Sequence, residues 1–346
     1  MASMVERAHT IAEEVLFPAV IEVDAQGVIP GSHFDLLAAQ GFYALGGDPE
    51  RGGVEVDLRS LVAILETLAG GCLTTTFTWV QHYSVVRGLT GTTNAELREK
   101  YLGSATRGEL RGGVAFAGAV PRPPRLWATA TDGGWLLSGE APFVTGWGIV
   151  DVLLISARNT ALTGEPTGTV VTGLVDAEAG AGITVEKLHM VAAQGSNTVR
   201  LRFEDYVLPA EKVTTEVSHR DFLATQPVSL RLSGCLAMGV AGRCIRMIGE
   251  AGCSEVAELL HAEHRMVRDR LDGGLGDPET LPAARAAASE LAYRCAGALV
   301  VAVGSSGILA RQHAQRLVRE ATFTLVSAGR PEIKNNLLGV FGRVHE

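Results

Sequence analysis

Two histidines three residues apart are the first candidates for chemistry in this chain. His261 and His264 lie within a helical pattern with Glu263 between them, a spacing that can bring two imidazoles to one metal ion. No H-E-x-x-H sequence and no further ligand cluster accompanies them. We therefore expect no metal site and place both histidines on a solvated helix face.

The glycine and cysteine patterns indicate neither a phosphate loop nor a disulfide framework. The GSSG sequence at 304–307 is too sparse for a phosphate loop on its own, no G-x-G-x-x-G follows a predicted strand, and G-x-x-x-x-G-K-[ST] is absent. The five cysteines are scattered, odd in number and form no CxxC pair. These features predict reduced, buried thiols in a cytoplasmic protein.

The spacing of apolar residues, which predicts the helices and strands that position a site, changes twice along the chain. Helical spacing of apolar residues dominates the first and last parts, whereas alternation and Val/Thr-rich runs dominate the middle. Asp57 and Ser32 are placed to cap helices, and Asp132-Gly133 predicts a hairpin turn. We expect helices over 34–39, 57–69, 73–89 and 93–102, strands over 127–131, 135–137, 152–157, 168–175 and 198–203, then helices over 228–249, 255–271, 281–303, 309–326 and 332–340.

This order predicts an α+β protein rather than a doubly wound nucleotide fold, because strands do not alternate with helices. The expected parts are an N-terminal helical domain (1–112), a middle antiparallel β-barrel domain (113–214) and a C-terminal helical bundle (215–346). The net charge of −8, from 30 basic and 38 acidic residues, argues against a nucleic-acid partner. No apolar run of bilayer length and no signal-peptide order is apparent, so we expect no membrane partner.

Several short motifs occur in an order that resembles the acyl-CoA dehydrogenase family over nearly the whole chain. They are AGGC at 69–72, EKYL at 99–102, GWLLSGEAPFVT at 134–145, GSNT at 195–198, FEDYVLPA at 203–210, GSSG at 304–307 and REA at 319–321, followed by Gly329. The resemblance implies an acyl-CoA dehydrogenase-like fold that holds FAD between the β-domain and the C-terminal helices.

The resemblance also implies which residues meet the flavin. Phe143, Val144 and Thr145 match the segment beside the isoalloxazine ring, where a hydroxyl and main-chain groups can hydrogen-bond N5; from the residues alone, Thr145 is equally a strand former. Phe116, Ala117 and Gly118 match a second flavin-lining strand end, and Ala328 matches a position beside the ring. The family usually has Ser or Thr where Gly118 stands, so any bond there must come from backbone.

A further match implies a homo-oligomer. The segment with Gly304, Ser305 and Gly307 resembles the loop that contacts the adenosine half of FAD from a neighbouring subunit, so at least a dimer is expected. The alternative is a simple bend between packed helices. The family's Arg-x-Phe-Gly motif, which clamps a neighbour's pyrophosphate, is missing around 251–256, and this puts that contact in doubt.

The usual catalytic base is absent at both positions where the family places it. The resemblance puts the glutamate at Ala328, before Gly329, or at Leu230, before Arg231. A positioned carboxylate is what removes the weakly acidic α-proton of a thioester. Three explanations stay open: a different base, oxidation of an alcohol or hydrated aldehyde without α-proton removal, or oxygen activation by a flavin monooxygenase.

Four polar residues are candidates near this chemistry. His82 and Gln81 lie on the buried helix that lines the acyl pocket in the family, and His82 is a candidate base or, as on most buried helices, a hydrogen-bonded core residue. Glu332 is a second candidate base, although Pro331 obscures its direction. Arg330 could bind a substrate carboxylate or phosphate bidentately, or face solvent.

The pattern is most similar to small actinomycete biosynthetic members that act on carrier-bound acyl groups. The closest resemblance is to the dehydrogenase that makes hydroxymalonyl-carrier protein, the precursor of the methoxymalonyl extender unit of polyketide assembly. We therefore expect an FAD-dependent oxidoreductase acting on an acyl thioester on a carrier protein or CoA. The alternatives are a flavin monooxygenase of the same fold and a non-catalytic member of the family.

Overall fold

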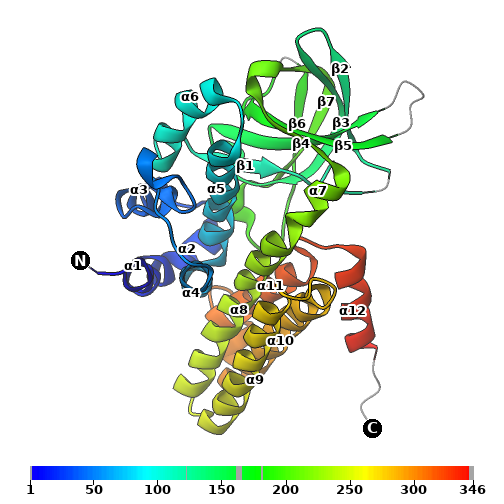
Figure 1. The fold of residues 1–346 in the computed structure, drawn as a ribbon. Helices are drawn as coiled ribbons and strands as arrows, with labels where there is room; N and C mark the ends of the chain where they lie inside the picture. The colour runs from blue at the N-terminus through cyan, green and yellow to red at the C-terminus, as the bar shows by residue number, and fades with distance from the viewer. Residues whose placement is uncertain (1, 122, 161–165, 181, 343–346) are drawn as a thin grey trace.

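A computed structural model describes residues 2–121, 123–160, 166–180 and 182–342. The N-terminal helices and the C-terminal helices flank a β-sheet, which sits above the long helices of the C-terminal part in Figure 1. The N-terminal helices are α1 (Met4–Ile11), a π-helical turn (Ala12–Leu16), α2 (Phe17–Gln26), α3 (Gly31–Ala39), α4 (Leu58–Gly71), α5 (Leu73–Gly91) and α6 (Ala95–Thr106).

Local sequence explains most of these helix starts. Asp57 caps α4 as predicted, its side chain accepting the amide of Ser60 at 2.6 Å. The caps of two other helices differ from the prediction. Ser32 lies inside α3, which begins after Pro30, and α6 is capped by Asn94 rather than opened by Thr93.

The middle part is one eight-stranded sheet, not the closed antiparallel barrel that the sequence suggested. Its order is β6-β7-β3-β2-β4-β5-β8, with β1 also pairing with β4. Among the described residues no pairing joins the outer strands β6 and β8, and the β1–β4 and β2–β4 pairs are parallel. The strands are β1 (Gly112–Ala115), β2 (Leu126–Thr131), β3 (Gly134–Val144), β4 (Val152–Thr160), β5 (Pro166–Asp176), β6 (Ile183–Lys187), β7 (Val199–Pro209) and β8 (Val213–Ser218). The predicted Asp132-Gly133 hairpin turn joins β2 to β3.

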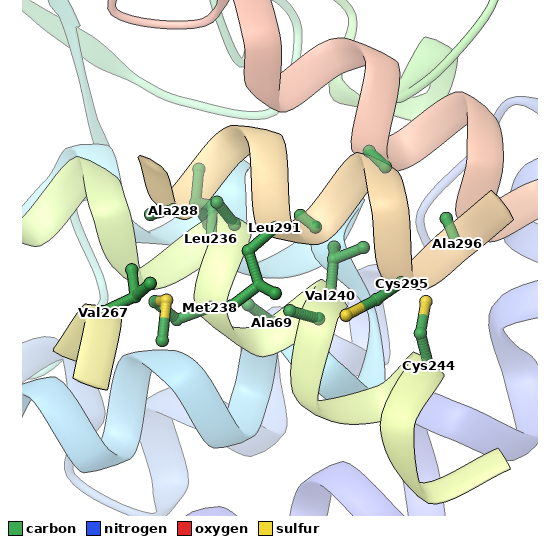
Figure 2. Close-up of a cluster of buried hydrophobic side chains, with 14 of the residues drawn as sticks. Ala69, Leu236, Met238, Val240, Cys244, Val267, Ala288, Leu291, Cys295 and Ala296 are labelled. Carbon is green, nitrogen blue, oxygen red and sulfur yellow. The ribbon is translucent and has the colours of Figure 1, made fainter. Parts of the chain in front are cut away.

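The C-terminal helices bury a core against α4. Figure 2 shows this core, in which Met238 and Val240 of α8 lie between Ala69 of α4 and Leu291 of α10. Gly239 allows the close approach, because a Cβ there would lie 2.5 Å from the carbonyl oxygen of Glu66. The helices are α7 (His219–Ala224), α8 (Gln226–Glu250), α9 (Ser254–Gly273), α10 (Leu281–Val303), α11 (His313–Val326) and α12 (Pro331–Phe341). Residues 304–308, predicted as a loop or a bend between two packed helices, form a 3₁₀ turn.

Two helical spans, 219–250 and 281–308, are long and apolar enough to cross a membrane by length and composition alone. The sequence expectation overlooked them because glycines and single charged residues interrupt their apolar runs. The first span is 72% buried over its most apolar window and packs as a core helix, which meets the same test. The second is only 33% buried, and within the described residues Val301 of α10 and Ile308 after it remain exposed.

Candidate flavin-binding site

The end of β3 carries an exposed aromatic ring on a strained backbone. Phe143 has φ 54° and its side chain is 66% exposed, although it lies between the buried residues Pro142 and Val144. The strain arises where the register with β7 shifts between Ala141 and Val144. A large apolar side chain held outward in the left-handed region is a feature that functional sites retain at a cost in stability.

A second strained segment, residues 193–198, is hydrogen-bonded to this strand end. The amide of Gly146 donates to the carbonyl of Ser196 at 2.8 Å, and Trp147 donates to Asn197 at 3.2 Å. Ala193 and Asn197 both have positive φ. Three residues with unfavourable backbone conformations, Phe143, Ala193 and Asn197, therefore lie where the end of β3 meets the segment 193–198. This clustering marks the junction of the two as the candidate site.

Buried hydroxyls follow Phe143 closely along the chain, beginning at Thr145. Thr145 Oγ1 is 3.2 Å from Thr198 Oγ1, which is 2.8 Å from Ser196 Oγ. All three residues are buried. The predicted flavin contact Thr145 is therefore part of a hydroxyl cluster at the junction rather than an isolated strand residue.

The second predicted flavin-lining segment, at the end of β1, is arranged differently. Phe116 is half-buried and its ring meets that of Phe222 edge-on at 6.5 Å, while Ala117 is exposed. Gly118 is buried, and its carbonyl accepts the amides of Arg125 and Leu126. A Cβ at Gly118 would lie 2.6 Å from the carbonyl oxygen of Glu140, so packing against β3 explains the glycine.

The turn after α11 presents Ala328 to solvent in the left-handed region, with φ 51°. Arg285, fully buried on α10, anchors this turn by donating to the carbonyls of Thr324 (3.2 Å) and Ser327 (3.4 Å). The hydroxyl oxygen of Ser327 is buried and has no hydrogen-bond partner among the residues that the structure describes. Sequence reasoning missed Arg285 and Ser327, since only the packing of α10 against α11 brings them together.

Arg330 and Glu332 follow this turn but differ in environment. The guanidinium of Arg330 is half-buried and donates to Oε1 of Gln226, at the start of α8, at 2.6 Å. Burial lowers the pKa of Arg330 from its ordinary value. Glu332 is exposed in the first turn of α12. Near the position where the resemblance places a carboxylate base, this turn therefore carries the cation of Arg330, held by Gln226.

His82 is held as a structural residue. Its Nε2 donates to the carbonyl of Ala105 at 3.0 Å and its Nδ1 accepts the amide of Gly112 at 2.9 Å. Burial lowers the pKa of His82 to about 4. Both ring nitrogens are thus engaged by backbone, which leaves neither to accept a substrate proton and corrects its candidacy as a base. Gln81 is half-buried and donates to the carbonyl of Phe77.

The other sequence candidates have clear local roles. Gly304 is exposed with φ 70° and ψ −153°, a conformation that requires glycine, and Ser305 beside it is also exposed. Gly307 is buried, and a Cβ there would lie 2.8 Å from Val303. Arg231 is fully buried and donates to Asp272 at 2.6 Å, so it is structural. No group of three or more metal-ligating side chains occurs in the described part of the chain.

Helix α5 and the segment 190–198 connect the strand end to α11. Gly146 faces Thr78 of α5, and Phe77 of α5 packs edge-on against Phe323 of α11 with ring centroids 4.9 Å apart. Arg319 of α11 donates to the carbonyl of Val191 at 3.0 Å. The β3 end and the Ala328 turn thus belong to elements that share α5 and this segment as neighbours.

Comparisons with known proteins agree with this arrangement. Residues 2–109 match the family model for the acyl-CoA dehydrogenase N-terminal domain. The chain is 21% identical to the human mitochondrial short-chain specific acyl-CoA dehydrogenase, over 96% of this chain and 87% of that protein. It is 22% identical to the cyclohex-1-ene-1-carbonyl-CoA dehydrogenase of Geobacter metallireducens, over 96% and 95%. Residues 2–109 are thus similar to the N-terminal domain of acyl-CoA dehydrogenases, and relatives with that activity align along nearly the whole chain.

Solved structures show the same fold. Butyryl-CoA dehydrogenase from Megasphaera elsdenii superposes with a TM-score of 0.82 at 21% identity, covering 98% of this chain and 97% of that one. KijD3, solved in complex with FMN and a dTDP-linked amino-keto sugar, superposes with a TM-score of 0.80 at 20% identity, covering 98% and 93%. The acyl-CoA dehydrogenase fold therefore also occurs in a protein crystallised with a sugar nucleotide.

Acyl-CoA dehydrogenases are enzymes that use FAD, so the likeness supports FAD as the cofactor of this chain. The residues present fit a flavin. Phe143 offers an exposed ring for a planar group, and the hydroxyl of Thr145, two residues further along the chain, has capacity for a further hydrogen bond. The unpartnered Ser327 hydroxyl adds a polar atom at the Ala328 turn.

Proposed function

We propose that this protein is an FAD-dependent oxidoreductase that oxidises a short acyl thioester carried by an acyl carrier protein. The observation that carries the proposal is the junction of Phe143 and Thr145 with the segment 193–198, because it combines an exposed aromatic face, buried hydroxyls and strained backbone. The proposed setting is the cytoplasm, in the synthesis of a methoxymalonyl-type polyketide extender unit.

The absence of a carboxylate favours oxidation at a hydroxyl-bearing carbon. Ala328 and Leu230 cannot remove an α-proton, and His82 has no free nitrogen. When bound, FAD supplies a two-electron acceptor that takes a hydride at N5. Oxidation of an alcohol or hydrated aldehyde breaks the C–H bond to give that hydride and releases only the hydroxyl proton. Water can take this proton.

Arg330 supports an anionic acyl group. Its guanidinium is tethered by Gln226 beside the Ala328 turn, and within the described residues no carboxylate lies at hydrogen-bond distance from it. A planar guanidinium binds a carboxylate with two parallel hydrogen bonds. A hydroxyacyl or malonyl-type thioester carries such a group, whereas a simple fatty acyl group does not.

Anaerobic stopped-flow absorbance tests this function. The FAD-loaded protein is mixed with a carrier-bound hydroxyacyl thioester, its carboxylate-free analogue or a saturated acyl-CoA. We expect the carrier-bound hydroxyacyl thioester to bleach the flavin and the saturated acyl-CoA to leave it oxidised. Arg330→Met should slow flavin reduction only by the substrate that carries a carboxylate. Bleaching by the saturated acyl-CoA alone would contradict the proposal.

A second candidate function is a flavin monooxygenase. The missing carboxylate is equally compatible with oxygen activation, and the KijD3 complex with FMN and a sugar nucleotide illustrates that this fold accepts substrates other than thioesters. The two functions differ in the source of the product oxygen. Incorporation of ¹⁸O from labelled O₂ would favour the monooxygenase, whereas bleaching without oxygen favours the oxidoreductase.

The proposed assembly is a homo-oligomer that covers α10. Tyr293, Gly297 and Val301 recur every four residues along one exposed side of α10, and Val301 is 81% exposed. Ile308, 75% exposed in the following turn, extends this apolar stripe to the segment beginning at Gly304. An apolar stripe of this kind on a long helix is what a second copy of the chain would bury.

A further inference from the structure

Three buried hydroxyls form a chain that ends at the flavin-facing strand. Ser196 Oγ lies 2.8 Å from Thr198 Oγ1, a normal hydroxyl–hydroxyl distance, and Thr198 Oγ1 lies 3.2 Å from Thr145 Oγ1, at the long end of the range. Ser196 is fully buried, and Thr198 and Thr145 are 4% and 3% exposed. Each hydroxyl has one proton to donate and two lone pairs to accept with.

The position of Ser196 determines the direction in which these three hydroxyls donate their hydrogen bonds. Within the described residues, the structure gives the Ser196 hydroxyl no hydrogen-bond partner other than Thr198. Its proton is therefore satisfied only if Ser196 donates to Thr198, which must then donate to Thr145. Reversed hydrogen bonds would leave the Ser196 proton buried without an acceptor, which is unfavourable for any buried polar group.

We propose that Ser196 and Thr198 are positioning residues that orient the Thr145 hydroxyl as a hydrogen-bond donor toward N5 of the flavin. The proposal rests on the proposed function, in which the ring lies against Phe143 and Thr145. With its oxygen accepting from Thr198, the proton of Thr145 is directed away from Thr198, and donation along a chain polarises the last hydroxyl. Oxidised flavin presents N5 as an acceptor, so it matches this donor.

A flavin analogue isolates this single hydrogen bond. In 5-deaza-FAD a C–H group replaces N5, so the ring keeps its shape but loses the acceptor. A protein whose Thr145 is fixed as a donor binds FAD more tightly than 5-deaza-FAD by about tenfold, the value of one buried hydrogen bond. A Thr145 hydroxyl that turns freely discriminates less, because the productive orientation is no longer preset.

The experiment compares affinities for the two flavins in four proteins, prepared as the full chain and stripped of cofactor. Thr198→Val keeps the side-chain shape but removes the hydroxyl, and Ser196→Ala removes the residue that sets the direction. Thr198→Ser, which keeps the hydroxyl, is the matched control. We expect Thr198→Val and Ser196→Ala to lower the preference for FAD at least about threefold, and Thr198→Ser to keep it within about twofold.

The analogue also separates a structural defect from the proposed role. Loss of packing would lower the affinity for both flavins equally. Loss of the Thr145 orientation would lower the affinity for FAD and leave that for 5-deaza-FAD unchanged. An unchanged FAD preference in Thr198→Val would overturn the positioning role while leaving the flavin site intact. Failure of the unsubstituted protein to bind either flavin would instead overturn the proposed function.

Discussion

The guanidinium of Arg285 donates to the carbonyl oxygen of Thr324 at 3.2 Å, so a fully buried cation of α10 holds the C-terminal end of α11. Its other hydrogen-bond partners among the described residues are the hydroxyls of Ser233 and Ser289 and the carbonyl of Ser327, none of them a carboxylate. Burial lowers the pKa of Arg285 to about 10. The partial negative charge at a helix C-terminus is what offsets this cation, and the Ala328 turn is fixed as a result.

Replacing Arg285 by Met should destabilise the protein by about 2–3 kcal/mol, because two buried carbonyls and two hydroxyls lose their donor. Arg294→Met on the same helix is the matched control. Arg294 is exposed and pairs with Glu263 and Glu290, so its loss should cost less than about 1 kcal/mol. Urea unfolding followed by circular dichroism measures both, and equal effects of the two substitutions would contradict an anchoring role.

Phe143→Gly should separate cofactor binding from stability. Glycine adopts φ 54° without strain, and the side chain that it removes is 66% exposed. We therefore expect the cofactor-free protein to unfold at the same free energy or up to about 1 kcal/mol higher, while FAD affinity falls about tenfold. Phe143→Leu keeps the strain but not the aromatic face, so it should lose affinity without gaining stability. Destabilisation by Phe143→Gly would show that the ring serves packing instead.

Sequence could predict the elements whose signals are local. Asp57 caps α4 because its side chain reaches an amide three residues on, and Asp132-Gly133 turns a hairpin by its own backbone preferences. The parallel pairing of β1 with β4 carries no such signal, because it depends on residues forty positions apart. The predicted closure of the sheet was wrong for the same reason: strand order is a long-range property.

The residues of the candidate site likewise fall into those that local sequence can predict and those that depend on long-range packing. The motif ending at Thr145 predicts which strand faces the flavin, because the resemblance is read from consecutive residues, and this assignment stays a prediction. The roles of Arg285 and Ser327 could not be read this way, since each depends on how α10 packs against α11. His82 was ambiguous for a further reason: its two backbone partners, Ala105 and Gly112, lie in other elements and only the folded chain brings them to the ring.

Stability should fall as the pH drops from about 6.5 to about 4, in part because of His82. Burial lowers its pKa from 6.5 to about 4 in the folded state, so in this window the unfolded chain binds a proton that the folded one does not. One such group gives a slope of up to about 1.4 kcal/mol per pH unit. His82→Gln keeps a donor and an acceptor but does not titrate, so its stability should fall less steeply. His264, with a pKa also lowered to about 4, maintains part of the slope in this variant.

Val301→Glu should dissociate the proposed homo-oligomer. The substitution places a charge at the most exposed apolar position of α10, where burial by a second copy would strip it of water. Val207→Glu is the control, because Val207 is 55% exposed but lies on β7, in the sheet rather than the helical bundle. Analytical ultracentrifugation should give monomers for the first variant and the original assembly for the second. A monomeric unsubstituted protein would contradict the proposed assembly.

Ala328→Glu tests whether the turn after α11 faces the reacting carbon. Ala328 is exposed and its backbone is held by Arg285, so a longer side chain meets no buried neighbour, although φ 51° costs about 1 kcal/mol for a non-glycine residue. A positioned general base contributes about 100-fold or more to proton removal. We therefore expect this variant to let a saturated acyl-CoA reduce the flavin, at a rate at least about tenfold above that of Ala328→Gln. Equal rates for the two variants would mean that the turn points away from the substrate, and the lack of a carboxylate there would no longer bear on the reaction.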